Sequence, residues 1–372
     1  MRFAGKSWTK EEILRRVGDI SQIGGARLVE LGEGRERGVR AVDFRCGNGF
    51  NFTVLPDRGM DISYAEYQGK ALGWISATGQ VAPYYFEPEG FGWLRSFFGG
   101  LLTTCGLTYA GAPCEDPKAE CLVSCVPTEE TGKCYLGLHG RISNTPAERV
   151  VCGGNWEGDE YLIWAQGRLR ESIVFGECLE MERRIWTYLG ERRLFIKDTV
   201  RNIGFVPSPL MLLYHINIGF PIVDEDSYLL GKVVEVVPRD EEAQKGLEAF
   251  NRFSAPIPGF KEQVFYLDLK EDEKGMVTVG IANRRLMEGM GVYVKYKKED
   301  LPYFTEWKMM GEGVYVVGLE PGNCHVQGRA KEREMGTLEI LNPAEEKVVE
   351  IEIGVLLKGE IDAAEQKLSS LV

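Results

Sequence analysis

The chain alternates between apolar and polar residues with a period of two from Ala26 onward, in short runs that turn residues separate. Every second residue then points to the same face of an extended chain, which is typical of a β-strand with one buried face. Such runs recur through the whole length, for example ARLVELG, VRAVDFRC, EYLIWAQGRLR, RRLFIKDTV, GMVTVGIAN and VVEIEIGVLL. Many short strands with few helical crossovers predict a mainly all-β fold, a large sandwich of antiparallel sheets.

Three segments carry a helical pattern instead. Residues 8–17 begin with Thr9 and Glu12, the two residues of a capping box, and an apolar stripe follows them. The segment Asp240–Phe250 and the tail after Glu360 also have helical spacing. We expect helices in these three places and strands almost everywhere else.

The domain organisation is simple because no internal boundary is visible. The chain has no low-complexity linker and no repeat, so the pattern predicts one β-sandwich domain over residues 26–360. A short helical lead over residues 1–25 precedes this domain, and a tail over residues 361–372 follows it. The longest irregular stretch, residues 79–100, is rich in aromatic residues, Gly and Pro. A loop of this length in a compact domain is usually functional, and we expect it to cover the edge of a site.

The charge of the chain excludes several classes of partner. The 372 residues include 44 Lys and Arg against 56 Asp and Glu, which gives a formal net charge of −12. So acidic a chain is a poor match for nucleic acid or for an anionic membrane surface. No apolar run approaches the roughly eighteen residues of a membrane-spanning helix, and the charged N-terminus is unlike a secretory signal. We expect a cytoplasmic protein with a small-molecule partner, and the composition leaves its oligomeric state open.

The chain has nine cysteines, and four of them fall within the segment Cys114–Cys134. No pair has the Cys-x-x-Cys spacing of a typical zinc site. Reduced thiols are the expectation for a cytoplasmic protein, and disulfides within this segment are the alternative.

The run Leu210–Pro221, LMLLYHINIGFP, places a single histidine in an otherwise apolar strand. The chain has only three histidines, and histidine is the side chain whose unperturbed pKa allows proton exchange near neutrality. On a straight strand His215 and Asn217 point to the same face. Two polar side chains on one face can line a cleft. A histidine satisfied by hydrogen bonds inside the core is the alternative.

Two further segments carry polar groups suited to a ligand. In GLHGRISNTPA, His139 lies between an apolar strand end and Gly140, with Arg141 and Asn144 close by. Glycine lets the backbone approach a ligand, and these side chains include the donors that a sugar hydroxyl needs. In LPDRGMDI, Arg58 can donate paired hydrogen bonds to a polar ligand. On local grounds a turn stabilised by its own side chains explains either segment as well or better.

The segment GLEPGNCHVQGR combines a carboxylate with another histidine. Glu320 follows the apolar run VYVVGL, where it is either exposed at a strand end or held in a pocket in which burial raises its basicity. His325 and Arg329 follow after a turn. Upstream, Trp307 offers an aromatic face on which a sugar ring can pack.

Taken together, these segments resemble the galactose mutarotase-like superfamily, the aldose 1-epimerases, and more closely its DUF4432 branch. The resemblance rests on LPDRGMDI, FFGGLLTTCGL, LHGRISNTPA, VRNIGFVPSPLMLLYHINIGFP and WKMMGEGVYVVGLEPGNC, which span roughly residues 50–330. It implies a large β-sandwich whose concave face holds a sugar.

The resemblance also implies roles for particular residues. His139, in Leu-His-Gly, resembles the first site histidine, His215 resembles the second, and Glu320, in Gly-Leu-Glu-Pro, resembles the catalytic base. Glu262, in FKEQVFYL, resembles a sugar-binding aspartate. Ionised Glu320 would take the proton of the anomeric hydroxyl while protonated His215 gives one to the ring oxygen. The ring would open and reclose as the other anomer by general acid and base catalysis.

Other side chains are expected to bind the sugar, and this mechanism needs no cofactor. His139 would also stabilise charge on the oxygen of the open-chain form. The expected substrate-binding residues are Arg58, Arg141, Asn144, Asn217, Glu262, Trp307 and Arg329.

Two other functions remain open as alternatives. His139, His215, His325 and Glu320 together are a complete donor set for a divalent metal, which favours a metal-dependent sugar isomerase or epimerase. A non-catalytic carbohydrate-binding protein is the second alternative. The sequence identifies neither the sugar nor its charge or phosphorylation state.

Overall fold

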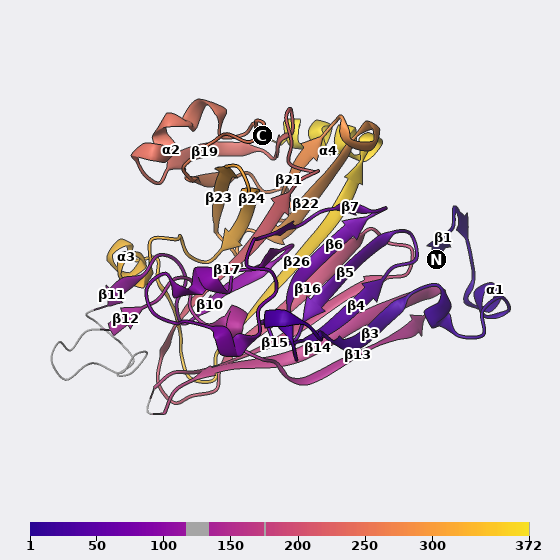
Figure 1. Cartoon of the computed structure of the whole chain (residues 1–372), viewed down its shortest axis with the longest axis horizontal. Coiled ribbons are helices and arrows are strands. Elements are labelled where there is room, and N and C mark those ends of the chain that lie inside the picture. The colour runs from indigo at the N-terminus through magenta and orange to yellow at the C-terminus, as the bar shows by residue number, and fades with distance from the viewer. Residues whose placement is uncertain (117–133, 175, 372) are drawn as a thin grey trace.

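Antiparallel sheets make up most of the regular structure, as the alternating pattern predicted (Figure 1). The computed structural model describes residues 1–116, 134–174 and 176–371. Its largest sheet has eight strands, in the spatial order β13 (Glu148–Glu157), β14 (Glu160–Ser172), β15 (Cys178–Tyr188), β16 (Arg193–Asn202), β26 (Glu346–Leu357), β22 (Met290–Lys297), β21 (Met276–Asn283) and β18 (Tyr228–Leu230).

A second sheet, of seven strands, carries the segments of greatest chemical interest. Its strands are β10 (Thr103–Leu107), β17 (Ser208–Gly219), β24 (Tyr315–Gly322), β23 (Tyr303–Met310), β20 (Gln263–Leu269) and β19 (Val233–Pro238), with β25 (Glu339–Leu341) paired to β17. The register pairs Ile216 with Leu319 and Thr305 with Glu320. Segments far apart in the chain therefore lie side by side on this sheet.

The N-terminal strands form a third sheet of five strands. They are β3 (Gly25–Glu30), β4 (Arg40–Arg45), β5 (Phe50–Leu55), β6 (Asp61–Tyr67) and β7 (Lys70–Ala71). Three strand pairs complete the described sheets: β1 (Arg2–Phe3) with β2 (Lys6–Ser7), β8 (Trp74–Ile75) with β9 (Gly99–Gly100), and β11 (Cys114–Asp116) with β12 (Cys134–Leu136).

The first helix begins where the capping box predicted. In α1 (Lys10–Leu14) the side chain of Thr9 caps the backbone of Glu12, and Glu12 caps Thr9 in return. The helix is shorter than the predicted 8–17. Ile13 is its one buried residue. With so little apolar burial, packing does not stabilise further turns.

The other two predicted helices also form, and one more was missed. The segment Asp240–Phe250 contains α2 (Glu241–Lys245) and a 3-10 turn, and Gly246 separates them. The tail forms α4 (Lys358–Ser369). The missed helix is α3 (Arg329–Met335), whose charged sequence has no apolar stripe that would have indicated it.

The strand β17 separates the main core from the functional face. Leu212, Tyr214, Ile216 and Ile218 belong to one large apolar cluster that includes side chains of all three sheets. The alternate residues point the other way, and among them Met211 and Leu213 pack in a second, smaller cluster. His215 lies on this second face, as the period of two predicted.

Beneath β17 a buried ionic network joins the three sheets. Arg183 of β15 donates hydrogen bonds to Asp198 of β16 and to Asp61 of β6. Tyr214 donates to Asp198 at 2.6 Å, and Thr104 donates to Asp61 at 2.6 Å. All these groups are fully buried. Because each charge is paired, the network holds β17 and β10 in a fixed position against the other sheets.

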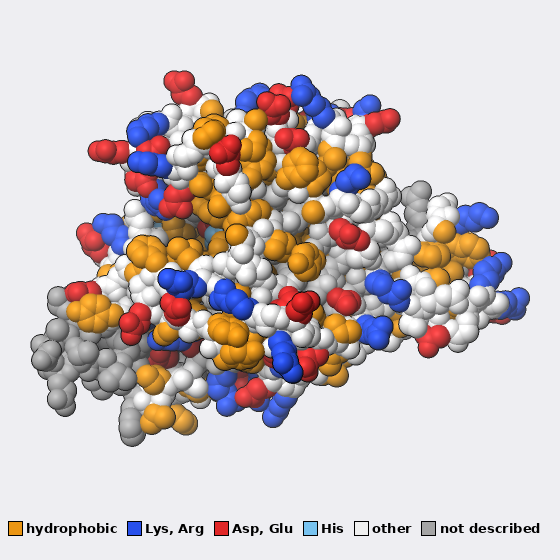
Figure 2. Space-filling view, in the orientation of Figure 1, with side chains coloured by type: hydrophobic (Ala, Val, Ile, Leu, Met, Phe, Trp, Pro, Cys, Tyr) orange, Lys and Arg blue, Asp and Glu red, His pale blue; other side chains and the backbone are white. Residues whose placement is uncertain are grey.

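The surface agrees with the mixed, acidic composition. Figure 2 shows Lys and Arg side chains interspersed with Asp and Glu over the face that it presents. Among the described residues, no helix is both long and apolar enough to cross a membrane.

Candidate active site

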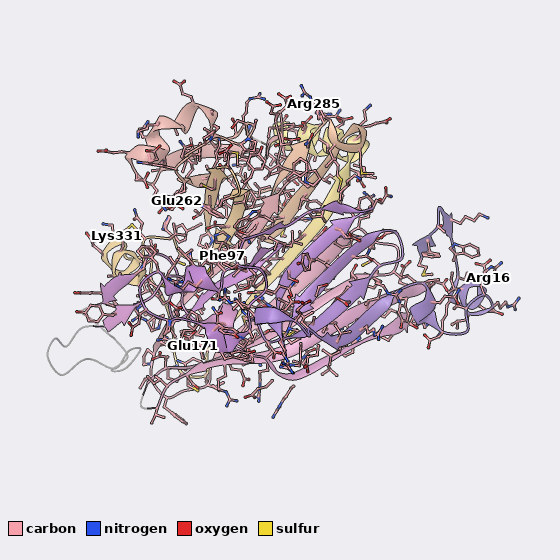
Figure 3. The ribbon with its side chains drawn as sticks, in the orientation of Figure 1. Arg16, Phe97, Glu171, Glu262, Arg285 and Lys331 are labelled. Atoms are coloured by element: carbon pink, nitrogen blue, oxygen red, sulfur yellow. The ribbon has the colours of Figure 1, made fainter. Side chains whose placement is uncertain are left out.

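A cavity of about 740 Å³, including its open mouth, lies against the second face of the seven-stranded sheet. In Figure 3, Phe97 and Glu262 mark its two sides. The loop over residues 79–100 contributes several of its side chains, which confirms that this stretch covers the edge of a cavity. The lining residues are Phe91, Trp93, Leu94, Phe97, Ala112, Leu138, His139, His215, Arg239, Glu262, Val264, Thr305, Trp307, Glu320 and Val326.

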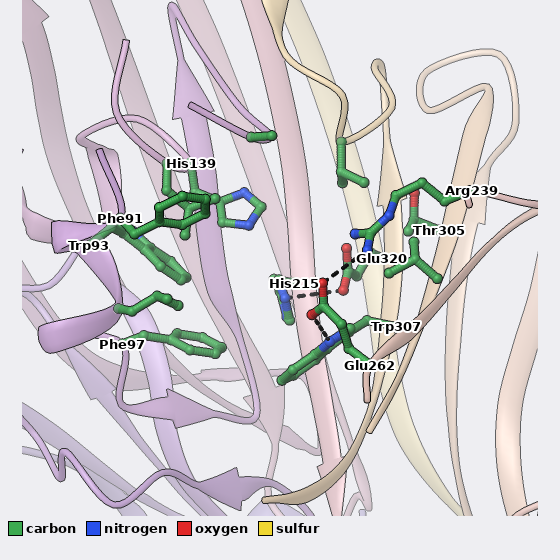
Figure 4. A pocket seen from close by; sticks show the side chains of 15 residues that line it. Phe91, Trp93, Phe97, His139, His215, Arg239, Glu262, Thr305, Trp307 and Glu320 are labelled. Atoms are coloured by element: carbon green, nitrogen blue, oxygen red, sulfur yellow. Dashed lines mark hydrogen bonds and ion pairs between the residues drawn. The ribbon is translucent and has the colours of Figure 1, made fainter. Parts of the chain in front are cut away.

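The two sides of the cavity differ in chemistry (Figure 4). We call one side the loop wall; it consists of Phe91, Trp93, Leu94, Phe97 and Leu138. We call the opposite side the sheet side; it consists of Thr305, Trp307, Glu320, Arg239 and Glu262. His215 lies between the two, and His139 stands beside the loop wall (Figure 4).

His215 and Glu320 face each other across neighbouring strands. The register between β17 and β24 places them directly opposite, and Nε2 of His215 lies 3.1 Å from Oε1 of Glu320. Their side chains are only 6 % and 2 % exposed. A carboxyl and an imidazole at this distance, both lining a cavity, can exchange a proton with each other and with a ligand.

Burial determines the charge of this pair. It raises the pKa of the Glu320 carboxyl well above its ordinary value; the neighbouring Glu262 raises this pKa further, whereas Arg239 lowers it. Burial lowers the pKa of His215 to about 4, although a contact with Asn217 acts in the opposite direction. Burial therefore favours the neutral form of both groups, in which the proton resides on Glu320 and not on His215. The sequence analysis placed that same proton on His215.

Asn217 supports His215 from behind. It does not line the cavity, which contradicts its predicted role in direct sugar binding. Its Nδ2 donates to the backbone oxygens of His215 and Gly99, at 2.9 and 3.2 Å, which leaves Oδ1 as the free acceptor. Oδ1 of Asn217 and Nδ1 of His215 are both buried, and neither atom has a hydrogen-bond partner in the described part of the chain. Nε2 of His215 is the nitrogen that faces Glu320, so in the neutral imidazole we assign the hydrogen to Nδ1, on the side of Asn217, whose contact raises the pKa of His215.

His139 is held in an unusual backbone conformation. Its φ of +56° lies in the left-handed region, and its backbone N–H donates to the carbonyl of Gly111 at 2.9 Å. In return, the N–H of Gly111 approaches Nδ1 of His139 at 3.4 Å. Burial lowers the pKa of His139 to about 3, and His215 contributes in the same direction. His139 is therefore neutral near pH 7, and with Nδ1 accepting, Nε2 carries the hydrogen.

Glu262 is fixed at the mouth by two donors. The indole of Trp307 donates to one carboxylate oxygen at 2.9 Å, and Arg239 donates to the other at 2.9 Å. The ring of Trp307 lies 5.3 Å from that of His215. The geometry therefore brings together five residues that the sequence singled out: His139, His215, Glu262, Trp307 and Glu320.

Sequence reasoning missed Thr305 and Arg239. Thr305 pairs with Glu320 in the sheet register, and its buried hydroxyl has no partner among the described residues. Its position two residues before Trp307 in PYFTEW was a usable signal, because residues two apart share a strand face. Arg239 directly follows β19, and only the pairing of β19 with β20 brings it to the cavity.

Arg58 does not reach the cavity, and its predicted role in sugar binding is wrong. Its guanidinium is 1 % exposed and donates to the backbone oxygens of Ser143, Val81 and Ser96, at 2.7, 2.5 and 2.8 Å. These carbonyls belong to the loop over residues 79–100 and to the segment after His139. Arg58 therefore braces the walls of the cavity from outside.

Three other predicted sugar ligands also lie outside the cavity. Arg141 is exposed to solvent, and Asn144 is buried beside Ser143. Arg329 is buried and donates to Asp116 at 2.7 Å, so its charge is compensated within the protein. Sequence spacing alone does not reveal the directions of these three side chains.

His325 lies apart from the other two histidines. Its Nδ1 is 3.2 Å from Oε1 of Glu332, and its ring packs against Tyr303 and Tyr266. It does not line the cavity. The proposed metal set of three histidines and Glu320 therefore does not assemble. Within the described ranges, no group of three or more His, Cys, Asp or Glu is arranged to hold a metal ion.

The cysteine cluster lies partly outside the described residues. Cys121 and Cys125 fall there, as does the side chain of Cys134. Cys114 is a free thiol, and the choice between reduced thiols and disulfides within this segment stays a prediction.

Comparisons with known proteins agree with this fold. The family model of DUF4432, a domain of unknown function, matches residues 36–355. A candidate aldose 1-epimerase from Klebsiella pneumoniae has a similar structure, with a TM-score of 0.83 and 24 % identity over 93 % of this chain and 87 % of that one. A galactose mutarotase-like protein from Clostridium acetobutylicum has a TM-score of 0.61 and 15 % sequence identity, over 91 % of this chain and 100 % of that one. Galactose 1-epimerase from Lactobacillus acidophilus has a TM-score of 0.56 and 12 % sequence identity, over 90 % of this chain and 99 % of that one. No curated protein sequence matches the chain.

Proposed function

The chain belongs to the DUF4432 family, with the fold of galactose mutarotase-like proteins, and from this premise we propose that it is an aldose 1-epimerase. Such an enzyme interconverts the two anomers of a free sugar by opening and reclosing the ring. The observation that carries the proposal is the contact of His215 with Glu320, at 3.1 Å, inside a cavity with aromatic walls. Ring opening needs one proton acceptor and one proton donor side by side, and this pair supplies both.

The distribution of polar groups orients the sugar. The hydroxyls on C1 and C2 are contiguous and need polar partners, which the sheet side offers in Glu320, Thr305 and Glu262. Along the edge formed by the ring oxygen and C5, an aldopyranose has no hydroxyl bonded directly to the ring. If the hydroxyls on C1 and C2 face the polar sheet side, the anomeric hydroxyl lies at Glu320 and the ring oxygen lies at His215.

Binding of the sugar prepares the pair for reaction. Apart from its 3.1 Å approach to Nε2 of His215, Oε1 of Glu320 has no partner for a hydrogen bond among the described residues. When sugar hydroxyls donate to this carboxyl, they favour its ionised form, and the proton passes over the 3.1 Å to Nε2 of His215. The cation on His215 is then stabilised by Oδ1 of Asn217 at its other nitrogen.

Ring opening follows with balanced proton transfers. Glu320 takes the proton of the anomeric hydroxyl, the bond between C1 and the ring oxygen breaks, and Nε2–H of His215 protonates that oxygen. The aldehyde group rotates about the bond between C1 and C2. Reclosure on its other face reverses both transfers and restores the pair. His139, whose Nε2 carries hydrogen, donates to the oxygen released from the ring. No cofactor takes part in this proposal.

Two other functions compete with this one. A metal-dependent isomerase would need His325 with the other donors, and His325 instead contacts Glu332. A non-catalytic carbohydrate-binding protein would have the same cavity but would not need an acid–base pair on its floor. The pair therefore favours an enzyme.

Anomer exchange is the decisive experiment. Each of a panel of aldoses is followed by anomer-resolved NMR in magnetisation-exchange mode, with and without the protein, and the spontaneous rate is subtracted. We expect exchange that grows in proportion to protein concentration for at least one aldose. Sugar binding without any gain in exchange would indicate the carbohydrate-binding alternative.

A further inference from the structure

The loop wall offers a sugar almost no hydrogen-bond partner. The side chains of Phe91, Leu94, Phe97 and Leu138 have no polar atom, and the one polar atom of the Trp93 side chain points away from the cavity. This indole N–H donates to the hydroxyl of Ser143 at 2.9 Å. His139 stands beside this wall (Figure 4), and in the proposed mechanism its Nε2–H donates to the oxygen released from the ring. Any further hydroxyl placed against the wall would lose its hydrogen bonds to water without replacement.

The backbone of the wall is also occupied. The N–H of Leu138 donates to the carbonyl of Gly90 at 2.9 Å. The carbonyl of Phe97 accepts hydrogen bonds from the hydroxyls of Ser76 and Thr78. These two backbone groups are therefore already engaged within the protein, and the wall presents mainly apolar side chains to a ligand.

The proposed function determines which part of the sugar meets this wall. C5 is bonded directly to the ring oxygen, so the group on C5 lies beside whichever side chain contacts that oxygen. That side chain is His215 in the proposed mechanism. The rings of Phe97 and Trp307 lie 5.2 and 5.3 Å from His215, and the indole N–H of Trp307 is already bonded to Glu262.

We propose that the substrate is a 6-deoxyaldose, in which C5 carries a methyl group rather than a hydroxymethyl group. This inference rests on the proposed function, because it takes the ring oxygen to lie at His215. A methyl group fills the space beside Phe97 and gains from apolar burial. A hydroxymethyl group would bury an unpaired hydroxyl, and a carboxylate or phosphate at this position would bury an uncompensated charge.

The competing arrangement makes the opposite prediction. If the sugar were turned so that Glu320 contacted the ring oxygen, the group on C5 would lie near Thr305. The free hydroxyl of Thr305 would then bind a C6 hydroxyl, and ordinary hexoses would be preferred.

The test compares sugars that differ only at C6. The pairs are D-fucose with D-galactose and L-rhamnose with L-mannose, together with D-galacturonate and galactose 6-phosphate. Dissociation constants come from tryptophan fluorescence of the intact protein, since Trp93 and Trp307 line the cavity. The same sugars are then compared by kcat/KM for anomer exchange. We expect the deoxy sugar of at least one pair to bind tenfold or more tightly than its parent, which is the scale of one unpaired hydroxyl.

One substitution reports on the wall itself. Phe97→Tyr introduces a hydroxyl close to His215, and we expect it to reduce the preference for the deoxy sugar. Phe205→Tyr adds the same hydroxyl to a side chain that is 97 % exposed and is not part of the cavity, and it should leave the preference unchanged.

The outcomes separate this inference from the function beneath it. If the protein catalysed anomer exchange with an equal or higher kcat/KM for the parent hexose, the uronate or the phosphate, the proposed preference for a deoxy sugar would be wrong. The proposed epimerase function would still stand. Tenfold tighter binding of the deoxy sugar without exchange would support the wall's preference and overturn the epimerase. If none of these sugars bound, both proposals would fail.

Discussion

Nε2 of His215 and Oε1 of Glu320 lie 3.1 Å apart on adjacent strands of one sheet, although 104 residues lie between them in the chain. Both side chains are buried, and both line the same cavity. The sheet register fixes this relationship, and the proposed chemistry depends on it.

Glu320→Gln should abolish most of the catalysis and keep the binding. The amide cannot accept the anomeric proton, so we expect kcat for anomer exchange to fall by about 10²–10⁴. The sugar dissociation constant should change little, because the amide still forms hydrogen bonds. Glu312→Gln, at an exposed position in the hairpin between β23 and β24, is the matched control. An unchanged rate in Glu320→Gln would remove this residue from the mechanism.

The pH profile should reflect the single proton of the pair. Below about pH 4 the pair gains a second proton, which binds to His215, because burial has lowered the pKa of His215 to about 4. The pair loses its only proton above the raised pKa of Glu320. We expect kcat/KM, corrected for the spontaneous reaction, to be level between these limits and to fall on either side. An acidic limb near the ordinary histidine pKa of about 6.5 would contradict the burial argument.

Asn217 should tune His215 without touching the sugar. Asn217→Leu removes the acceptor behind Nδ1, so we expect the pKa of His215 to fall further and kcat to drop about tenfold with KM nearly unchanged. Asn217→Asp should raise the pKa of His215 instead, because a carboxylate favours the imidazolium. Imidazole NMR titration measures both shifts. Equal effects of the two substitutions would mean that Asn217 is only a packing residue.

Substitutions at the mouth should move the alkaline limb in opposite directions. Glu262 raises the pKa of Glu320, and Arg239 lowers it. Glu262→Gln should therefore shift the alkaline limb of kcat/KM to lower pH, and Arg239→Gln should shift it to higher pH. Both variants break the same ion pair, so each controls for loss of that contact. Shifts of the same sign would show that the ion pair, rather than its field at Glu320, matters.

Arg58 and Arg141 should differ in stability. Arg58→Met leaves three buried carbonyls without their donor, at about 1–3 kcal/mol each, so the free energy of unfolding should fall by at least about 3 kcal/mol. Arg141→Met, at an exposed position, should stay within about 0.5 kcal/mol of the parent and leave KM for the sugar unchanged. Chemical denaturation measures both values. A large rise in KM for Arg141→Met would restore its predicted role in binding.

The sequence by itself determined the fold class and the chemical identity of the site. A period of two along almost the whole chain allows only sheets, since each strand must bury one face. The same period assigned His215 to the face opposite Tyr214, and the rarity of histidine drew attention to it. His139, Glu262, Trp307 and Glu320 were recognised because their local segments resemble a known superfamily.

Only the tertiary structure decided which polar residues share a cavity. Arg58 and Arg329 look like ligand-binding residues in sequence, yet each is buried and compensated by partners distant in the chain. Arg239 and Thr305 reach the cavity because β19, β20, β23 and β24 pair in a particular order. The location of the proton on the His215–Glu320 pair also depends on burial. Burial comes from packing the whole chain, and local residue patterns carry no direct measure of it.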